Sequence, residues 1–252
     1  MKIPSKTELK NEDERYLYWQ DTDAHGSFAD SKRTSIIIQS VKKYSFGKKI
    51  LDIGCAQGNI ATLLAENGFG AVALDLNQSF LNYAKKKREF GDISYVCASA
   101  LNMPFENEKF DAVIIGELVE HVAYPEKLLK EAKRVLKPGG LMIITTPNNH
   151  IFLGMLSGIK PELFEDIKDR NKLLKRQFGP AGKDHLFVFD KKSLNALLER
   201  QGFEIILGGY VNSFLMNPFT YHLFRFIPDF LVKIPFLNSK LSLGLYAAAR
   251  KK

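Results

Sequence analysis

Short apolar runs alternate with amphipathic segments along most of this chain. The apolar runs are rich in β-branched residues, which predicts buried strands. The amphipathic segments repeat their apolar positions every three or four residues, which predicts helices. We expect strands at residues 50–53, 71–75, 93–97, 110–116, 141–146, 204–207 and 241–249, and helices at 31–44, 59–67, 78–90, 125–136 and 191–201.

The alternation of strands and helices indicates βαβ units, whose right-handed crossovers build a parallel sheet. We therefore predict an α/β fold, with a Rossmann-like, seven-stranded, mostly parallel sheet, helices on both of its faces and an α-helical cap. Ligands of such sheets bind beyond the carboxyl ends of the strands. Candidate site residues are accordingly sought at 52–58, Asp75, 99–101 and 116–121.

The pattern divides the chain into four regions. Residues 1–45 are expected to form an N-terminal helical arm, and residues 46–150 the ligand-binding core. The alternation of strands and helices stops near His150, so residues 151–190 are interpreted as a helical cap inserted over the strand ends. Residues 191–252 are expected to return to the core sheet, with an aromatic-rich insertion at 210–240.

The strand at 50–53 leads into a loop of small residues, which are Gly54, Cys55, Ala56 and Gly58. Small residues let a ligand approach the backbone, and the N-terminus of the following helix offers it N–H donors. The spacing of the glycines departs from the dinucleotide fingerprint, which requires a third glycine three residues after the second. Asp75 ends the second strand, where an acid can accept hydrogen bonds from both hydroxyls of a ribose.

Several motifs, in their order, resemble the class I S-adenosylmethionine-dependent methyltransferases over most of residues 45–150. They are ILDIGCAQG, AVALDLN, CASALNMPFENEKFDAVI and LLKEAKRVLKPGGLMIITTPN. The resemblance implies that residues 46–150 bind S-adenosylmethionine. It also implies a set of cofactor contacts: Asp52, Gly54, Cys55, Ala56 and Gly58 around the methionine and ribose, Asp75 and Leu76 at the ribose and adenine, Ser99, Ala100 and Leu101 at the adenine rim, and Gly116 and Glu117 below the methionine end. Many relatives carry glycine at the position of Ala56 and aspartate at that of Ser99.

Two glutamates and a histidine follow the fourth predicted strand, in the pattern Glu117-x-x-Glu120-His121. On a helix these positions share one face, and His185 supplies a second imidazole later in the chain. Carboxylates and imidazoles together suit Mg²⁺, Mn²⁺ or Zn²⁺, so Glu117, Glu120, His121 and His185 are candidate metal ligands. The pattern looks like that of the ubiquinone-pathway O-methyltransferases and is also similar to the metal quartet of small-RNA 2′-O-methyltransferases. The metal-free alternative makes His121 and Glu120 the catalytic residues, with His121 as the base.

The composition is that of a basic globular protein. The 252 residues include 36 Lys and Arg against 28 Asp and Glu, which gives a net charge of +8. Such a charge favours anionic partners, but the lysines are dispersed in short clusters, so we interpret them as a solvated surface.

Two cysteines and a polar N-terminus without an apolar segment predict a cytoplasmic protein. Glycines, asparagines and prolines interrupt the aromatic stretch at 210–240, which indicates a hydrophobic subdomain. The alternative is a lipid-facing surface peripheral to the inner face of a membrane.

These features together predict an S-adenosylmethionine-dependent methyltransferase that O-methylates a small acceptor, apolar or lipid-like in character. Such an enzyme aligns the acceptor with the methyl group and removes the acceptor's proton. One alternative is an RNA methyltransferase with a metal-assisted 2′-hydroxyl mechanism, although no recognisable RNA-binding module is present. The alternative from another class is a non-catalytic, cofactor-binding partner subunit, which Glu117 and His121 disfavour. The acceptor, the atom that is methylated and the oligomeric state stay open.

Overall fold

The computed structural model describes residues 28–87, 91–149, 169, 185–186, 188–213 and 242–252. The first part of the predicted arm, most of the predicted cap at 151–190 and most of the predicted insertion at 210–240 lie outside these residues. The four-region division therefore stays a prediction. The two cysteines, Cys55 and Cys97, are free thiols, the first buried and the second exposed. In the part of the chain that is described, no helix combines the length and the hydropathy needed to cross a bilayer.

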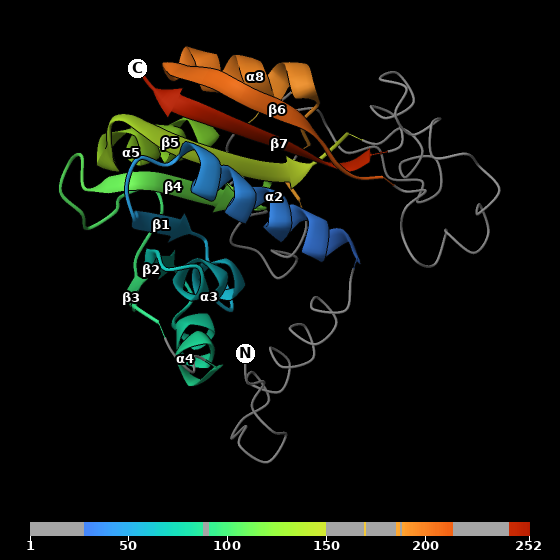
Figure 1. Cartoon of the computed structure of the whole chain (residues 1–252). Helices are drawn as coiled ribbons and strands as arrows, with labels where there is room; N and C mark the ends of the chain where they lie inside the picture. The colour runs from blue at the N-terminus through green and yellow to red at the C-terminus, as the bar shows by residue number, and fades with distance from the viewer. Residues whose placement is uncertain (1–27, 88–90, 150–168, 170–184, 187, 214–241) are drawn as a thin grey trace. The chain divides into compact units, whose positions relative to one another are not determined.

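The described chain forms a seven-stranded sheet flanked by helices, as Figure 1 shows. Its strand order is β3-β2-β1-β4-β5-β7-β6, and β7 runs antiparallel to the others. The strands are β1 (Lys49–Ile53), β2 (Gly70–Asp75), β3 (Ile93–Cys97), β4 (Phe110–Gly116), β5 (Leu136–Pro147), β6 (Phe203–Ser213) and β7 (Ser242–Lys251). The helices are α2 (Phe28–Tyr44), α3 (Asn59–Glu66), α4 (Gln78–Lys87), α5 (Pro125–Val135) and α8 (Lys191–Arg200), with a 3₁₀ turn η2 (Val119–His121). The predicted Rossmann-like, mostly parallel sheet is confirmed.

The chain divides into two compact units, which are described separately below. The first contains residues 1–116, 130–143 and 251, and the second contains residues 117–129, 144–250 and 252.

In the first unit, β1 lies between β2 and β4, and both pairings are parallel. Ile53 is aligned with Leu74 on one side and with Ile115 on the other, so three strands end at nearly the same level. Ile50, Leu51 and Ile53 are fully buried, because a parallel sheet is covered on both of its faces. α3 and α4 lie beside β1 to β3 (Figure 1, teal). This arrangement leaves the loops at the carboxyl ends of the strands as the place for a ligand.

In the second unit, α8 packs on β6 through buried apolar side chains, which include Leu194, Leu198 and Phe203. Asp190 begins this helix as an N-cap, since its carboxylate accepts a hydrogen bond from the Ser193 N–H at 2.7 Å and the Ser193 hydroxyl completes a capping box. The segment before the helix is joined to the end of β5 by a parallel bridge between Asn148 and Phe189. Phe189 therefore lies beside the carboxyl end of β5.

Two predicted boundaries are wrong. The predicted turn at 137–140 belongs to β5, which begins at Leu136 instead of Leu141. Gly139 has a φ of 68°, so the glycine bends the strand locally, as a β-bulge does, without ending it. The sixth strand is also longer than the predicted 204–207, because β6 continues through the glycine pair at Gly208 to Ser213. Local composition marked both places as breaks, whereas pairing with neighbouring strands keeps them extended.

Candidate active site

The loop after β1 carries three residues in the left-handed region of backbone space, in alternation. Gly54 has a φ of 71°, Ala56 of 45° and Gly58 of 73°. Glycine adopts this conformation without cost, whereas an alanine is strained there. Gly58 is also restricted by space, because a Cβ at its position would lie 3.0 Å from the Cβ of Ala84. The alternation explains why small residues occupy every second position of this loop.

Asp75, the last residue of β2, holds this loop in place. Its Oδ2 accepts a hydrogen bond from the Ala56 N–H at 2.9 Å, and its Oδ1 accepts one from the Asn77 N–H at 2.8 Å. The N–H groups of Gly54 and Cys55 both donate to the Leu74 carbonyl, at 2.8 and 3.0 Å. The loop and the end of β2 therefore form one hydrogen-bonded element, and the bond from Ala56 helps to maintain its unusual φ.

Asp52 brings a buried carboxyl group to the base of the same loop. Its side chain is 1% exposed, and its Oδ2 has no hydrogen-bond partner among the described residues. Burial raises the pKa of Asp52 to about 7, with a further contribution from the negative charge of Asp75, while a hydrogen bond from the Ala61 N–H and the charge of Arg33 act in the opposite direction. A buried carboxyl oxygen without a partner fits a ligand that carries positive charge.

The carboxyl ends of β2 and β3 offer a mixture of apolar and polar groups. Leu76 is 64% exposed, although most of the described leucines of this unit are buried. Ser99, Ala100 and Leu101 form a tight turn, in which the Ser99 hydroxyl accepts from the Leu101 N–H at 3.2 Å and the Ser99 carbonyl accepts from the Asn102 N–H at 3.1 Å. Cys55 is buried, and burial raises the pKa of its thiol, so it remains neutral. An exposed apolar side chain beside a polar turn suits a flat heterocycle.

The second unit gathers Glu120, His121 and His185 into one cluster. One ligand atom of each lies within 4.8 Å of those of the other two. The His121 and His185 ring centroids are 4.9 Å apart, and the rings meet edge to face. The Glu120 side chain is fully buried, whereas that of His121 is 31% exposed, and Nε2 of His121 lies 3.9 Å from Oε1 of Glu120. The two side chains form an ion pair when the imidazole is protonated.

The route by which these groups meet differs from the prediction. The prediction that residues 117, 120 and 121 share one helical face is wrong, because the 3₁₀ turn contains only Val119–His121. Glu117 precedes it with a φ of 52°, and its N–H donates to the Thr145 carbonyl at 3.0 Å. Among the described residues the cluster contains one of the two predicted glutamates, Glu120. The left-handed residue redirects the chain as it leaves β4, since its N–H bonds across to β5.

Two hydrogen bonds that the sequence did not indicate build the cluster. The Leu186 N–H donates to the Glu120 carbonyl at 2.9 Å, which brings His185 beside the 3₁₀ turn. The Thr146 hydroxyl donates to Oε2 of Glu120 at 3.0 Å, in a fully buried contact. The sequence could have indicated Thr146 as a site residue, because it ends a predicted strand and strand ends line the ligand site of such sheets.

Comparison with known proteins identifies a domain family for the central part of this chain. Residues 51–144 match the methyltransferase domain family. The chain is 32% identical over 118 residues to a demethylmenaquinone methyltransferase of Paenarthrobacter aurescens (strain TC1), over 47% of this chain and 46% of the relative. It is 31% identical over 106 residues to a ubiquinone biosynthesis O-methyltransferase of Coxiella burnetii (strain Dugway 5J108-111), over 41% of this chain and 45% of the relative. The chain therefore matches just under half the length of these relatives.

Solved structures add support for the fold. A putative methyltransferase from Bacillus halodurans C-125 superposes with a TM-score of 0.57, over 86% of this chain and 97% of that one, at 19% identity. The strand order is that of a Rossmann-like α/β protein, and the small-residue loop after β1 lies at the carboxyl end of a central strand, where ligands of such sheets bind. Residues 51–144 therefore carry an S-adenosylmethionine-dependent methyltransferase domain, and this part of the chain is distantly related to the two quinone methyltransferases above.

Proposed function

We propose that this protein transfers the methyl group of S-adenosylmethionine to a hydroxyl group of a small acceptor that is apolar or lipid-like. The methyltransferase domain supplies the donor part of this proposal. The observation that carries the acceptor part is the Glu120–His121–His185 cluster, which places a half-exposed imidazole against a buried carboxylate. A hydroxyl acceptor must lose a proton as it is methylated, and an imidazole is the usual group that takes it near neutral pH.

The first unit is proposed to hold the donor. Asp52, Gly54, Cys55, Ala56 and Gly58 would surround the methionine and ribose portions. The other proposed cofactor contacts in this unit are Asp75, Leu76, Ser99, Ala100, Leu101 and Gly116. Glu117, the first residue of the second unit, is also a proposed contact. Oδ2 of Asp52, which has no hydrogen-bond partner in the described part of the chain, supports this assignment, since S-adenosylmethionine carries positive charge. Methyl transfer from a sulfonium is an in-line displacement, so holding the donor in one orientation is the main contribution of these residues.

The second unit is proposed to receive the proton. His121 would act as the general base through its exposed edge. Glu120 is fully buried, so it would not touch the acceptor and would instead orient the imidazole and stabilise its charged form. The Thr146 hydroxyl in turn fixes the Glu120 carboxylate at 3.0 Å. This series of contacts resembles the way in which a buried acid orients a catalytic histidine in hydrolases.

The same three side chains also form a donor set that a divalent metal accepts. One carboxylate and two imidazoles within 4.8 Å of one another suit a borderline ion such as Zn²⁺ or Mn²⁺ better than Mg²⁺, which prefers oxygen ligands. When bound, such an ion would lower the pKa of an acceptor hydroxyl. Elemental analysis of protein purified without chelator, followed by assays after chelation and after re-addition of each ion, separates the two mechanisms. Full activity in the metal-free protein supports the base.

The apolar character of the acceptor is proposed from the two relatives, whose names place them in demethylmenaquinone methylation and in ubiquinone biosynthesis. The proposal is tested by calorimetry with S-adenosylmethionine, followed by transfer of a labelled methyl group to a panel of acceptors. The panel contains polyprenylated phenols, short-chain phenols, amines and total RNA. Labelled polyprenylated or short-chain phenols support the proposal. No binding of the cofactor, or label on amines alone, contradicts it.

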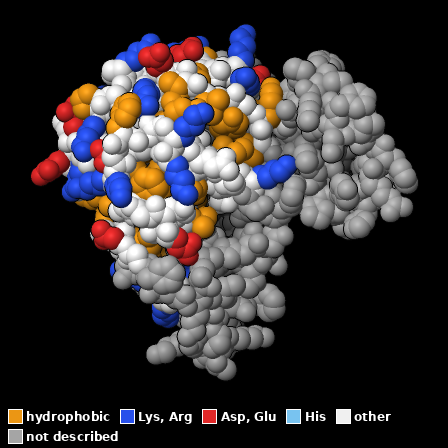
Figure 2. All heavy atoms as spheres, in the orientation of Figure 1, with side chains coloured by type: hydrophobic (Ala, Val, Ile, Leu, Met, Phe, Trp, Pro, Cys, Tyr) orange, Lys and Arg blue, Asp and Glu red, His pale blue; other side chains and the backbone are white. Residues whose placement is uncertain are grey.

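RNA is the alternative acceptor that the same panel tests. The described face in Figure 2 shows lysine and arginine side chains dispersed among uncharged and acidic ones, without a continuous basic stripe. Recognition of nucleic acid normally requires such a stripe, and the resulting affinity falls steeply with salt. Label in RNA together with salt-sensitive RNA binding would replace the proposed acceptor class. Tight cofactor binding without transfer to any acceptor, even with cell extract added, would favour a non-catalytic subunit.

A further inference from the structure

The connection between β3 and β4 has an unusual construction. Residues 98–109 cross from the edge of the sheet to the far side of β1 without any helix. Parallel strands are normally joined by a helix, which satisfies its own backbone groups, and irregular segments of this length are uncommon outside functional loops. The polar backbone groups of this segment therefore need partners from elsewhere.

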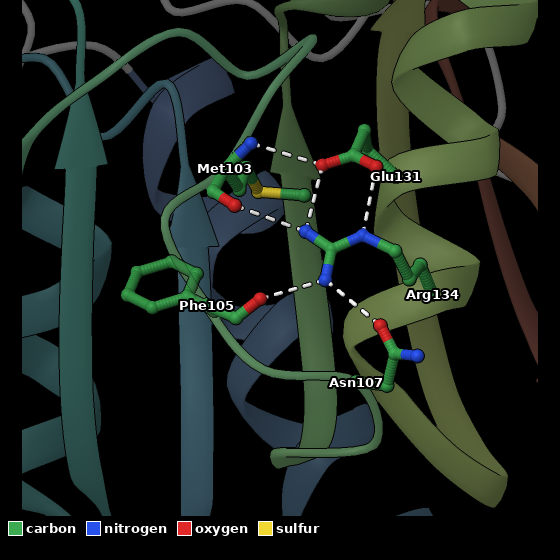
Figure 3. A network of polar contacts seen from close by, with 5 residues as sticks. All are labelled: Met103, Phe105, Asn107, Glu131 and Arg134. Atoms are coloured by element: carbon green, nitrogen blue, oxygen red, sulfur yellow. Dashed lines mark hydrogen bonds and ion pairs between the residues drawn. The ribbon is translucent and has the colours of Figure 1, made fainter.

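Two side chains of α5, Glu131 and Arg134, supply these partners, as Figure 3 shows. Oε2 of Glu131 accepts from the Met103 N–H at 2.9 Å. The Arg134 guanidinium donates to the Met103 carbonyl at 2.9 Å, to the Phe105 carbonyl at 2.6 Å and to the Asn107 side chain at 3.0 Å. Arg134 and Glu131 also form a two-pronged ion pair, with both contacts at 2.8 Å. We call this pair the α5 clamp.

The α5 clamp is rigid for reasons of charge and shape. The hydrogen bond from Arg134 holds the pKa of Glu131 below its usual range, and Glu131 raises the pKa of Arg134. Both groups are thus charged at physiological pH, and hydrogen bonds to charged groups are stronger than neutral ones. Only a planar guanidinium reaches two carbonyls, an amide oxygen and a carboxylate at once, so lysine is no equivalent here. Met103, which the clamp contacts from both sides, is itself buried.

The clamp acts next to the part of the connection that is proposed to face the cofactor. Residues 99–101 lie between two anchors. On one side the Ala98 N–H donates to the Asp75 carbonyl at 3.0 Å, and on the other side Met103 is held by the clamp. Within the turn, further bonds to Ser99 fix the positions of Leu101 and Asn102. Loss of either anchor would free the turn that carries Ser99, Ala100 and Leu101.

We infer that Glu131 and Arg134 are positioning residues for the adenine end of S-adenosylmethionine, although neither belongs to the proposed cofactor contacts. This inference rests on the proposed function, because it takes residues 99–101 as the adenine rim. The clamp pre-orders the rim before the cofactor arrives, so binding does not have to order it. Weakening the clamp should therefore lower cofactor affinity and reduce the discrimination between adenine and other bases.

The experiment compares the whole protein with its Arg134→Lys and Glu131→Gln variants, at a temperature well below the unfolding midpoint of each. The probes are S-adenosylhomocysteine and S-inosylhomocysteine, which differ only in the base. We expect Arg134→Lys to weaken binding of S-adenosylhomocysteine about tenfold, and to bring the affinities of the two probes closer together. Hydrogen exchange at residues 99–107 should accelerate in the free variant and slow again when the cofactor is bound.

Lys137→Gln is the matched control. It removes an ion pair of 2.7 Å to Asp111 at the amino end of β4, in the same unit and away from residues 99–101. This control should lower the unfolding midpoint at most, with both affinities unchanged. If Arg134→Lys does not fold, Asn107→Ala replaces it, because this variant removes a single clamp bond. It should weaken binding of S-adenosylhomocysteine by less than Arg134→Lys does, and should again bring the affinities of the two probes closer together.

The outcomes separate this inference from the proposed function. Folded clamp variants that bind both probes within twofold of the wild-type protein would overturn the positioning role, even if their unfolding midpoints fall. Failure of the wild-type protein itself to bind S-adenosylhomocysteine or S-adenosylmethionine would overturn the proposed function, and the inference with it. Equal weakening for both probes would also overturn it, because the clamp would then not act through the adenine rim.

Discussion

The loop after β1 and the histidine cluster are built in opposite ways. The loop takes its shape from neighbouring elements: small residues in left-handed conformations, hydrogen-bonded to the adjacent β2 at Leu74 and Asp75. The cluster brings His185 to residues 120 and 121 across more than sixty positions of sequence, through one backbone bond from Leu186 to Glu120. The proposed donor site, which is built locally, is therefore recognisable as a sequence motif, whereas the proposed acceptor site, which is assembled from distant segments, is not.

Because the loop and the cluster are built separately, a substitution in one should leave the function of the other intact. The largest effect is expected at the cluster. His121→Ala should lower methyl transfer by roughly 10²- to 10⁴-fold, because the proton of the acceptor loses its base. Affinity for S-adenosylmethionine should stay within about twofold of the wild-type value, since the loop of the first unit is intact. Steady-state kinetics with the best acceptor of the panel and calorimetry measure the two quantities. Unchanged turnover in this variant would remove His121 from the mechanism.

The second-largest effect is expected at the loop. Asp75→Ala removes the bonds to Ala56 and Asn77, which hold the loop, together with the proposed ribose contact. A hydrogen bond to a charged group contributes about 1.5 to 3 kcal/mol, so loss of the ribose contact alone should lower cofactor affinity by roughly 10- to 100-fold. The matched control is Asp92→Ala, an exposed acid of the same unit, which should bind normally. Calorimetry provides the affinities. A variant that binds as tightly as the control would show that Asp75 has only a structural role.

A smaller effect is expected from the ionisation of Asp52, which should make stability and cofactor affinity depend on pH. Its pKa is raised from 3.8 to about 7 in the folded protein, so between about pH 4 and pH 7 the native state binds a proton that the unfolded state has lost. The free energy of unfolding of the cofactor-free protein should therefore fall as pH rises through this window. A cationic cofactor favours the ionised carboxylate, so its affinity should rise about tenfold from pH 6 to pH 8 relative to Asp52→Asn. Parallel pH profiles for the two proteins would contradict this prediction.

The smallest effect is expected at Ala56. Glycine at this position removes the strain of a φ of 45° but adds freedom to the unfolded chain, so Ala56→Gly should change the free energy of unfolding by less than about 1 kcal/mol. Gly58→Ala should destabilise by more, because its Cβ would meet Ala84 at 3.0 Å in a left-handed conformation. Thermal unfolding of the two variants side by side tests this order. A larger loss for Ala56→Gly than for Gly58→Ala would contradict the strain argument.

Much of the first unit followed from the sequence. Strands at 93–97 and 110–116 were predicted with the bounds that the structure has, because both segments are rich in apolar and β-branched residues and their boundaries are marked by polar or small residues. The sequence indicated two of the three left-handed positions of the loop, Gly54 and Gly58, but not Ala56. The α5 clamp was not visible at all, because Glu131 and Arg134 look like ordinary charged residues of an amphipathic helix.

The sequence by itself determined the class of fold, the small-residue loop and the acid that ends β2. Each of these depends on local periodicity or on the conformational freedom of single residues, which are properties of short segments. Only the tertiary structure decided that Glu117 leaves the predicted face with a φ of 52°, and that His185 meets His121. It also decided that a buried oxygen of Asp52 has no hydrogen-bond partner among the residues that the structure describes. These features depend on burial and on hydrogen bonds between segments far apart in the chain, and the order of residues alone does not specify which distant groups will meet.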